Sequence, residues 1–355
     1  MKLQTLGWDD FFAQRYLPFQ AEGWFPARVM QAQRGLYHLQ GESAIGVAEV
    51  SGRFSHQATQ SQDFPTVGDW VLVGGESALV IHHVLPRKSL FSRMAPGSRT
   101  EEQLIAANVD TVFLVSGLDH DFNPRRIERY LVLASESGAE AVIVLNKMDQ
   151  VEPERLPERM AAVQAVAPHT PIHPISAHAD QGLDTLDPYL QAGKTVALLG
   201  SSGVGKSTLT NHLLGRRVQA IQALRADDSK GRHTTTGRSL FLLPSGALLL
   251  DTPGMRELQL WGTEDGLGAT FEDIEALAED CRFRDCRHEG EPGCAVAAAI
   301  ADGRLGGDRL TSYHKLQREL QHLARQQDHQ AQLAEKRRWK QIHKSLRYHP
   351  KYNQR

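Results

Sequence analysis

The sequence has few cysteines, no long apolar run and almost no net charge. Only three of its 355 residues are cysteine, and 40 Lys+Arg stand against 42 Asp+Glu, a formal net charge of −2. No stretch approaches the roughly 18 uncharged apolar residues of a membrane-spanning helix, and an Asp9-Asp10 pair interrupts the polar first twenty residues. We therefore expect neither a signal peptide nor a membrane span. Three clustered cysteines also argue against a disulfide scaffold.

The near-neutral total hides an uneven charge distribution. Residues 303–355 contain 13 Lys+Arg and 4 Asp+Glu, a local charge of +9, which leaves −11 on the preceding 302 residues. The segment 335–347 mixes Lys and Arg with Trp339. Basic side chains neutralise phosphates and an aromatic ring can stack on an exposed base. A solvated helix face and an RNA-binding tail both fit this pattern, so the net charge does not exclude a nucleic-acid partner.

Short β-type runs alternate with turn residues in the first quarter of the chain. They are Trp24–Val29, Ala44–Val50, Asp69–Val73 and Ala78–Val84. Four or five short strands in so short a span indicate a small barrel or sandwich, of which an OB-type barrel is one option. A β module of another purpose and an RNA-binding barrel are equally compatible with the pattern. The polar, turn-rich segment Pro86–Glu102 is interpreted as a linker.

Buried-type strands alternate with helical segments further along. The strands are Asp110–Ser116, Ala141–Leu145, Thr195–Leu199 and Ala247–Leu250, with a helix at Arg125–Glu136. This alternation predicts an α/β domain with a parallel sheet. After Thr270 the pattern becomes helical, and Leu316, Leu320 and Leu323 share one helix face that we expect to pack on a core.

A glycine-rich segment matches the phosphate-binding loop pattern G-x-x-x-x-G-K-[ST]. It consists of Gly200, Ser201, Ser202, Gly203, Val204, Gly205, Lys206 and Ser207. Backbone N–H groups of such a loop surround phosphate oxygens at the start of the following helix, here Thr208–Leu214. We expect the loop and Thr208 to bind a nucleoside triphosphate, with Lys206 reaching the β- and γ-phosphates and Ser207 ligating Mg²⁺.

The choice of base is indicated by a second motif. Asn146, Lys147, Met148 and Asp149 follow a buried strand. An ionised Asp only accepts hydrogen bonds, so Asp149 suits the N1–H and N2–H₂ donors of guanine and opposes adenine. These residues resemble the guanine-specificity box N-K-x-D of GTPases. Ser176 and Ala177 resemble the weaker second guanine box.

A D-x-x-G motif closes the last buried strand. We expect Asp251 to hold the Mg²⁺ shell and Gly254 to offer its N–H to the γ-phosphate. Ordinary GTPases run P-loop, switch I, D-x-x-G, N-K-x-D, S-A, whereas here N-K-x-D and S-A come first. The same parallel sheet can form with its chain ends relocated, and switch II then leads directly into the C-terminal region.

The three cysteines cluster around one histidine. Cys281, Cys286, His288 and Cys294 supply three thiolates and one imidazole within 14 positions. That set is enough for a closed tetrahedral Zn²⁺ site, and a closed site is structural because no position remains for water. Buried core cysteines are the alternative, but they would not be expected to cluster among charged residues.

The permuted order, the segments GRHTTT (231–236) and DTPGMRE (251–257) and the cysteine cluster together resemble the ribosome small subunit-dependent GTPase A family over essentially the whole chain. The resemblance implies a multidomain fold. Residues 1–100 would form an OB-type β-barrel domain with a linker, 101–265 a circularly permuted α/β P-loop GTPase domain, and 266–355 an α-helical zinc-binding domain with a basic tail. It also implies a GTP hydrolase that binds the small ribosomal subunit and its rRNA, acts in late maturation and is stimulated by the subunit. We expect a cytoplasmic monomer that uses GTP/GDP, Mg²⁺ and one structural Zn²⁺.

Catalysis needs a group that positions water. Many GTPases place a Gln directly after D-x-x-G for this purpose, but here the residue is Met255. His233 could accept a hydrogen bond from water, a role that the family resemblance implies. Its alternative is an exposed histidine on a loop. Thr234 or Thr235 is expected to ligate Mg²⁺ in the GTP state.

Two other functions remain open at this point. One is an RNA-binding assembly chaperone that uses GTP only as a conformational sensor. The other is a permuted GTPase that serves the large subunit. Phosphate release with and without small subunits distinguishes these possibilities.

Overall fold

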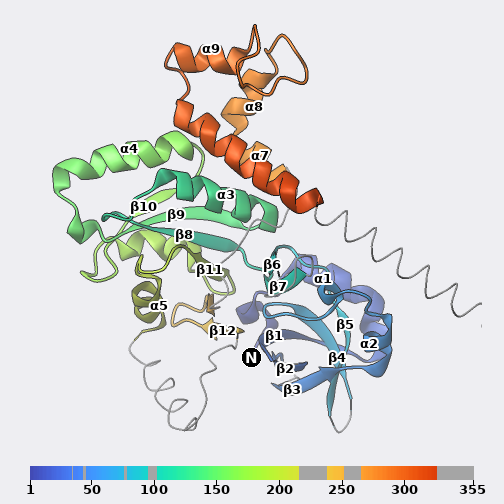
Figure 1. The fold of residues 1–355 in the computed structure, drawn as a ribbon. Helices are drawn as coiled ribbons and strands as arrows, with labels where there is room; N and C mark the ends of the chain where they lie inside the picture. The colour runs from blue at the N-terminus through green and yellow to red at the C-terminus, as the bar shows by residue number, and fades with distance from the viewer. Residues whose placement is uncertain are drawn as a thin grey trace, which may run out of the picture.

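The structure, a computed structural model, describes residues 1–33, 35–42, 45–75, 78–94, 102–215, 238–251 and 265–325. These residues form a β-barrel, a central sheet with helices on both faces, and a C-terminal group of helices (Figure 1). Within these ranges, each helix is too short or too polar to cross a bilayer. The architecture confirms the predicted multidomain class.

The first domain is a closed five-stranded barrel. Its strands are β1 (Phe25–Gln33), β2 (Leu36–Gln40), β3 (Ile45–Val50), β4 (Trp70–Gly74) and β5 (Leu79–Val84). They pair in the order β1-β2-β3-β5-β4, and β4 pairs back with β1. Helix α2 (Gly52–Gln57) connects β3 to β4. This topology confirms the OB-type barrel, and it contains one strand, β2, that the sequence analysis missed.

The barrel is preceded by short helices that pack on its aromatic core. They are α1 (Asp10–Tyr16) and the 3-10 helices Leu3–Leu6 and Leu17–Glu22, and a further 3-10 turn, Ser61–Asp63, precedes β4. Phe12 and Trp70 are almost completely buried, and the rings of Trp8 and Trp70 meet edge to face at 4.8 Å. These aromatic contacts attach the N-terminal segment to the barrel.

The predicted linker at Pro86–Glu102 is wrong in part. Leu90–Met94 forms strand β6, which pairs antiparallel with β7 (Glu102–Ala107). Phe91 is only 2% exposed and Ser89 is buried as well. The polar composition suggested a loop, but a strand with one buried face needs apolar residues only at alternate positions.

The central sheet is mostly parallel. Its order is β10-β9-β8-β11-β13-β12, and only β12 is antiparallel to its neighbour. Its strands are β8 (Thr111–Gly117), β9 (Glu140–Asn146), β10 (Ile172–Pro174), β11 (Thr195–Leu199), β12 (Arg238–Leu242) and β13 (Leu248–Asp251). Its helices are α3 (Pro124–Ser137), α4 (Leu156–Val166) and α5 (Lys206–Leu214), with 3-10 turns at Met148–Gln150, Pro153–Arg155 and Leu183–Tyr189.

Each sheet face has its own core. Along β8, Val112 and Leu114 pack on the side of α3 and α4, whereas Phe113 and Val115 pack on the side of α5. Side chains of a strand alternate between faces, so a continuous apolar run serves both cores. The near-complete burial of these strands explains why the sequence predicted them well.

The C-terminal helices lie against the α3 side of the sheet (Figure 1). They are α7 (Asp265–Thr270), α8 (Glu272–Ala278), α9 (Ala295–Ala301) and a longer helix described over residues 307–325. Leu316 and Leu320 are buried in the shared core and Leu323 packs against it. The predicted core-facing stripe is confirmed.

The barrel and the central sheet are joined by one strand pairing. β1 pairs antiparallel with β12 through Gln31↔Ser239 and Ala32↔Arg238, so the sheet runs on from one domain into the other. Arg28, also on β1, is 1% exposed and donates to the carbonyls of Leu6, Gly68 and Asn108, the last at 2.9 Å. Burial lowers the pKa of Arg28 to about 10, although nearby aspartates partly oppose this.

Candidate nucleotide and metal sites

The predicted nucleotide motifs meet at one edge of the central sheet. Strands β8, β9, β10 and β11 are mutually parallel, and the loops that follow them begin at residues 118, 147, 175 and 200. In open α/β sheets ligands bind outside the carboxyl ends of the strands. The permuted chain order therefore leaves the motifs in one place.

The phosphate-binding loop (Gly200–Ser207, hereafter the P-loop) depends on two glycines. A methyl group on Gly200 would lie 2.2 Å from the carbonyl oxygen of Val115, so the loop can pass this close to β8 only without a side chain. Gly205 has φ +96° and precedes the first residue of α5. Lys206 Nζ lies 2.7 Å from the carbonyl oxygen of Gly200 and also contacts that of Ser201. Ser202, Gly203, Ser207 and Thr208 are exposed, whereas Val204 is buried in the core.

Asn146 connects three of the motifs. It is 3% exposed, and its Nδ2 donates to the carbonyl of Val204 in the P-loop at 2.8 Å. Its Oδ1 accepts from the backbone N–H of Ala177 at 2.9 Å. A buried amide with both ends satisfied fixes its own orientation and that of its partners. The N-K-x-D, S-A and P-loop segments thus form one rigid assembly.

Asp149 and Ser176 face each other directly. The Ser176 hydroxyl donates to Asp149 Oδ1 at 2.5 Å and accepts from the backbone N–H of Ala179 at 3.0 Å. The backbone N–H of Met148 donates to the carbonyl of Ile175 at 3.0 Å. The Asp149 carboxylate is therefore oriented by the second guanine motif. In the sequence, the only sign of this contact was that both motifs follow strands.

Lys147 has an acidic partner that sequence reasoning missed. Its backbone is left-handed, with φ 69°, and its Nζ lies 2.7 Å from Asp119 Oδ2. The Asp119 side chain is only 7% exposed. Burial alone would raise the pKa of Asp119, but the hydrogen bonds from Lys147 and from the Asp121 amide lower it overall. Asp119 follows the end of β8, so its place at the binding edge was a signal that the sequence offered.

A second missed group lies against the P-loop. The Ser201 hydroxyl donates to Asp121 Oδ2 at 2.8 Å, and Arg126 Nη1 lies 2.9 Å from the same hydroxyl. Arg126 also pairs with Asp121 at 2.5 Å. The hydrogen bond from Arg126 is the main cause of the lowered pKa of Asp121.

The remaining predicted nucleotide residues are only partly described. Asp251 ends β13, which is the parallel neighbour of β11, so its backbone lies at the same edge of the sheet as the P-loop. Gly254, His233, Thr234 and Thr235 lie outside the described residues, as does the basic tail. Their predicted roles stay predictions.

The cysteine cluster forms a compact group of ligand atoms. One donor atom from each of Cys281, Cys286, His288 and Cys294 lies within 4.8 Å of the others. Cys281 Sγ and Cys294 Sγ are 4.0 Å apart, and His288 Nδ1 lies 3.7 Å and 3.4 Å from them. Tetrahedral Zn²⁺ with Zn–S bonds of about 2.3 Å would separate sulfurs by about 3.8 Å.

The surroundings of the sulfurs also suit a metal. Backbone N–H groups of Ala295 and Ala297 each donate at 3.3 Å, to Cys281 Sγ and Cys294 Sγ respectively. Such bonds stabilise thiolates. All three cysteines are free, and together with His288 they form a group that could hold a metal ion.

These features define a class: a P-loop protein with the guanine-recognition motifs of GTPases in permuted order and an attached metal-binding group. A family model described as RsgA GTPase matches residues 84–261, and one described as 50S ribosome-binding GTPase matches residues 195–334. The chain belongs to the RsgA GTPase family, and it is a GTPase.

Relatives of known name match nearly the whole chain. A protein of Opitutus terrae is 48% identical over 98% of this chain and 97% of its own length, and one of Syntrophotalea carbinolica is 43% identical over 96% of each. Both are named small ribosomal subunit biogenesis GTPase RsgA.

Solved structures share the architecture. YjeQ from Thermotoga maritima superimposes with a TM-score of 0.62 at 28% identity, covering 83% of this chain and 98% of that one. YloQ, described as a circularly permuted GTPase, has a TM-score of 0.60 at 27% identity, covering 84% and 96%. The permuted order that the sequence predicted is confirmed.

Proposed function

We propose that this chain binds the small ribosomal subunit, acts in its late maturation and hydrolyses GTP faster when the subunit is bound. The observation that supports guanine-nucleotide hydrolysis most directly is the buried Asn146, whose side chain joins the two guanine motifs to the P-loop. The names of the relatives from Opitutus terrae and Syntrophotalea carbinolica support the choice of the small subunit.

We assign guanine selection to Asp149. Its carboxylate would accept from the two guanine donors. The Ser176 hydroxyl, which donates to Asp149 Oδ1 at 2.5 Å, would keep the carboxylate oriented, and Lys147 would lie beside the base. Two hydrogen bonds to a charged group contribute about 1.5 kcal/mol each at the lower end. Asp149→Ala should therefore weaken GTP binding on the order of 100-fold. Asp184→Ala removes an exposed carboxylate elsewhere in the domain and is the matched control.

The phosphates would lie on the P-loop at the start of α5. Lys206 would exchange its present carbonyl partners for phosphate oxygens, and the exposed Ser207 is free to face Mg²⁺. Bound Mg²⁺ would neutralise charge on the β- and γ-phosphates. We assign Asp251 and one of Thr234 and Thr235 to its shell, and Gly254 to the γ-phosphate. His233 is our candidate for positioning water, and His233→Ala should lose the hydrolysis that small subunits stimulate.

We assign one structural Zn²⁺ to Cys281, Cys286, His288 and Cys294. Three thiolates and an imidazole are a characteristic zinc set, and their spacing fits a tetrahedral ion. The ion would stabilise the loop between α8 and α9. Metal analysis of protein purified without chelator should give one zinc per chain, and Cys294→Ser should reduce that content.

We infer that the barrel and the basic tail contact rRNA, and that the protein works as a cytoplasmic monomer. The division into domains 1–100, 101–265 and 266–355 is part of this proposal. Deleting residues 330–355 should weaken subunit binding and flatten its salt dependence. Truncated protein that binds the subunit as tightly as the full chain at both low and high salt would contradict a role for the tail.

The deciding experiment measures phosphate release from GTP with small subunits, with large subunits and with neither. Stimulation by small subunits alone is the expected result. Stimulation by large subunits would favour the alternative that the second family description suggests. Subunit binding without any hydrolysis would indicate an RNA-binding chaperone that only senses GTP.

A further inference from the structure

The first turn of α3 contacts the P-loop. Asn123 caps this helix by accepting from the backbone N–H groups of Arg125 and Arg126. Arg126 then reaches the Ser201 hydroxyl at 2.9 Å while it pairs with Asp121 at 2.5 Å. Ser201 is thus fixed by two charged groups that belong to the loop before α3 and to α3 itself.

Helix α3 also contacts the C-terminal helix (residues 307–325), through side chains next to Arg126 on its surface. Arg125 pairs with Asp308, with Nε to Oδ2 at 3.2 Å, and Arg129 forms a two-pronged pair with Glu319, both distances being 2.7 Å. Bidentate Arg–carboxylate pairs are strong and directional. Residues 126 and 129 differ by about 4.5 Å along the axis of an α-helix. The two sets of contacts are therefore carried by adjacent turns of one rigid element.

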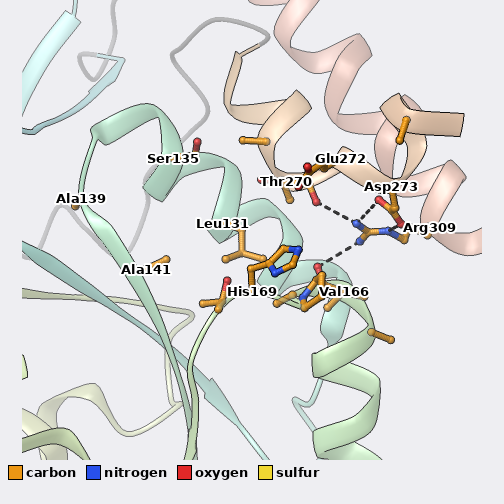
Figure 2. A pocket seen from close by; sticks show the side chains of 16 residues that line it. Leu131, Ser135, Ala139, Ala141, Val166, His169, Thr270, Glu272, Asp273 and Arg309 are labelled. Atoms are coloured by element: carbon orange, nitrogen blue, oxygen red, sulfur yellow. Dashed lines mark hydrogen bonds and ion pairs between the residues drawn. The ribbon is translucent and has the colours of Figure 1, made fainter. Parts of the chain in front are cut away.

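A buried ion pair reinforces the attachment. Glu128 is fully buried and accepts from Arg309 Nη1 at 2.9 Å. Arg309 is 6% exposed, pairs with Asp273 at 2.6 Å and 2.7 Å, and donates to the carbonyls of Thr270 and Val166. Figure 2 shows Arg309 with Asp273, Thr270 and Val166 beside a cavity of about 520 Å³, whose lining includes no residue of the P-loop or of N-K-x-D.

Helix α3 and the C-terminal helix are partly separated on the side of Arg126, the residue that contacts the P-loop. A groove of about 480 Å³ lies there, and the side chains of Arg125, Arg126, Arg129 and Lys315 line it. The Arg125–Asp308 and Arg129–Glu319 pairs connect the two helices here, beside the buried Leu316 of the shared core. A small shift of α3 would therefore change the ion pairs and the Ser201 contacts together.

We propose that Arg126 is a positioning residue for the P-loop, and that α3 couples nucleotide binding to attachment of the C-terminal helix through Arg125, Glu128 and Arg129. The inference rests on the proposed nucleotide role of the P-loop. Nucleotide bound to the P-loop favours one position of Ser201, and Ser201 in turn favours one position of Arg126. Because Arg126 is part of α3, that position of α3 favours the docked C-terminal helix. Coupling between two sites is reciprocal, so docking must also tighten nucleotide binding by the same factor.

The test is a double-mutant cycle on nucleotide affinity. Affinity for a fluorescent GDP and for a non-hydrolysable GTP analogue is measured for wild type, Arg126→Ala, Glu319→Ala and the double variant. Arg126→Ala should weaken binding about three- to tenfold, because its bonds are charged but partly exposed. Glu319→Ala, far along the chain from every nucleotide motif, should weaken it about threefold, below the typical coupling range of about 5- to 150-fold because the Arg129–Glu319 pair is partly exposed. In the Arg126→Ala background Glu319→Ala should have no further effect.

A second readout uses the reciprocal direction. Amide hydrogen exchange over residues 307–325 should slow about threefold when nucleotide binds to wild type, and this change should disappear in Arg126→Ala. Arg126→Lys, which keeps the charge but not the planar fork, should restore part of the coupling. Arg155→Ala is the matched control, because Arg155 is 63% exposed and, within the described part of the chain, its ion pair is with Glu152 on the surface.

The outcomes separate this inference from the proposed function. Wild-type protein that fails to bind guanine nucleotide would overturn the proposed function. Normal wild-type binding that is unchanged in Glu319→Ala, with exchange over 307–325 indifferent to nucleotide, would overturn the coupling alone. If Arg126→Ala does not fold, Ser201→Ala removes the same contact from the loop side and must abolish the nucleotide-dependent change in exchange.

Discussion

Replacing Arg309 with methionine tests what attaches the C-terminal helices to the GTPase domain. Arg309 forms a junction between α3, the end of α4 and α8, because its guanidinium contacts Glu128, Asp273 and two backbone carbonyls. Figure 2 shows the contacts with Asp273 and the carbonyls. Its guanidinium carbon lies 4.7 Å from the centre of the Phe271 ring. Methionine keeps much of the apolar stem over that ring and removes only the charge and the donors.

The expected loss follows from the burial of its partners. Removing one member of a buried ion pair costs about 3–5 kcal/mol. The Asp273 side chain is 42% exposed and can regain water, while Glu128, with no exposure, keeps Arg125 as a partner. These facts favour the lower end. Arg309 also lies in the first turn of the helix 307–325. A cation there costs about 0.3–1 kcal/mol through the helix dipole, and the substitution removes that cost. We expect local opening of residues 307–325 to become easier by about 2–3 kcal/mol, roughly a 30- to 150-fold faster exchange.

Native-state amide exchange of the 307–325 region is the suitable assay, since a multidomain protein has no single unfolding free energy. Arg304→Met is the control, because Arg304 pairs with Asp302 at 3.4 Å and both side chains are about 60% exposed. Such a pair contributes less than about 0.5 kcal/mol. If exchange in Arg309→Met stays within twofold of that in Arg304→Met, the junction is not the attachment that its geometry indicates.

Three further predictions concern the barrel, the P-loop and the connection between domains. Burial lowers the pKa of His83 from 6.5, so the unfolded chain takes up the proton first as the pH falls. The stability of the barrel, complete above pH 6.5, should therefore decrease below that pH. Thermal unfolding followed by tryptophan fluorescence should show this decrease, and an unchanged dependence of the melting temperature on pH in His83→Phe would contradict it. Gly205→Ala places a methyl group 2.2 Å from Asn146 Nδ2 at φ +96°, so it should weaken nucleotide binding at least about tenfold while circular dichroism stays normal; wild-type affinity would refute the proposed role of this contact. Arg28→Met removes the side-chain donor from the buried carbonyls of Leu6 and Asn108, while the Gly68 carbonyl keeps Asn108 Nδ2. It should destabilise the barrel by about 3 kcal/mol; a wild-type melting temperature would show that the two carbonyls find other partners.

Short motifs with strict chemical demands could be predicted from the sequence. Phosphate binding requires glycine where backbone approaches backbone, as at Gly200, and guanine recognition requires an acceptor such as Asp149. Zinc requires soft ligands, and the cysteine cluster supplies them within a few turns of chain. Each requirement acts over a short distance in the sequence, so the pattern alone was sufficient to propose these sites.

The structure decided what depends on distant segments. Strand β6 was mistaken for a linker because its five residues lie within the polar, turn-rich segment Pro86–Glu102, and its partner β7 defines it as a strand. β2 was missed because it is only five residues long and its exposed face carries the apolar Leu36, which obscures the alternation of apolar and polar residues.

The groups around the motifs belong to the same category. Asp119 is 28 residues from Lys147 along the chain, Arg126 is 75 residues from Ser201, and Arg309 is 181 residues from Glu128. No local periodicity records such pairs, because only the parallel sheet and the docked helices bring their charges within hydrogen-bond distance. The sequence by itself therefore determined which ligands the protein is equipped to bind, whereas the tertiary structure decided which residues orient the binding groups and join the domains.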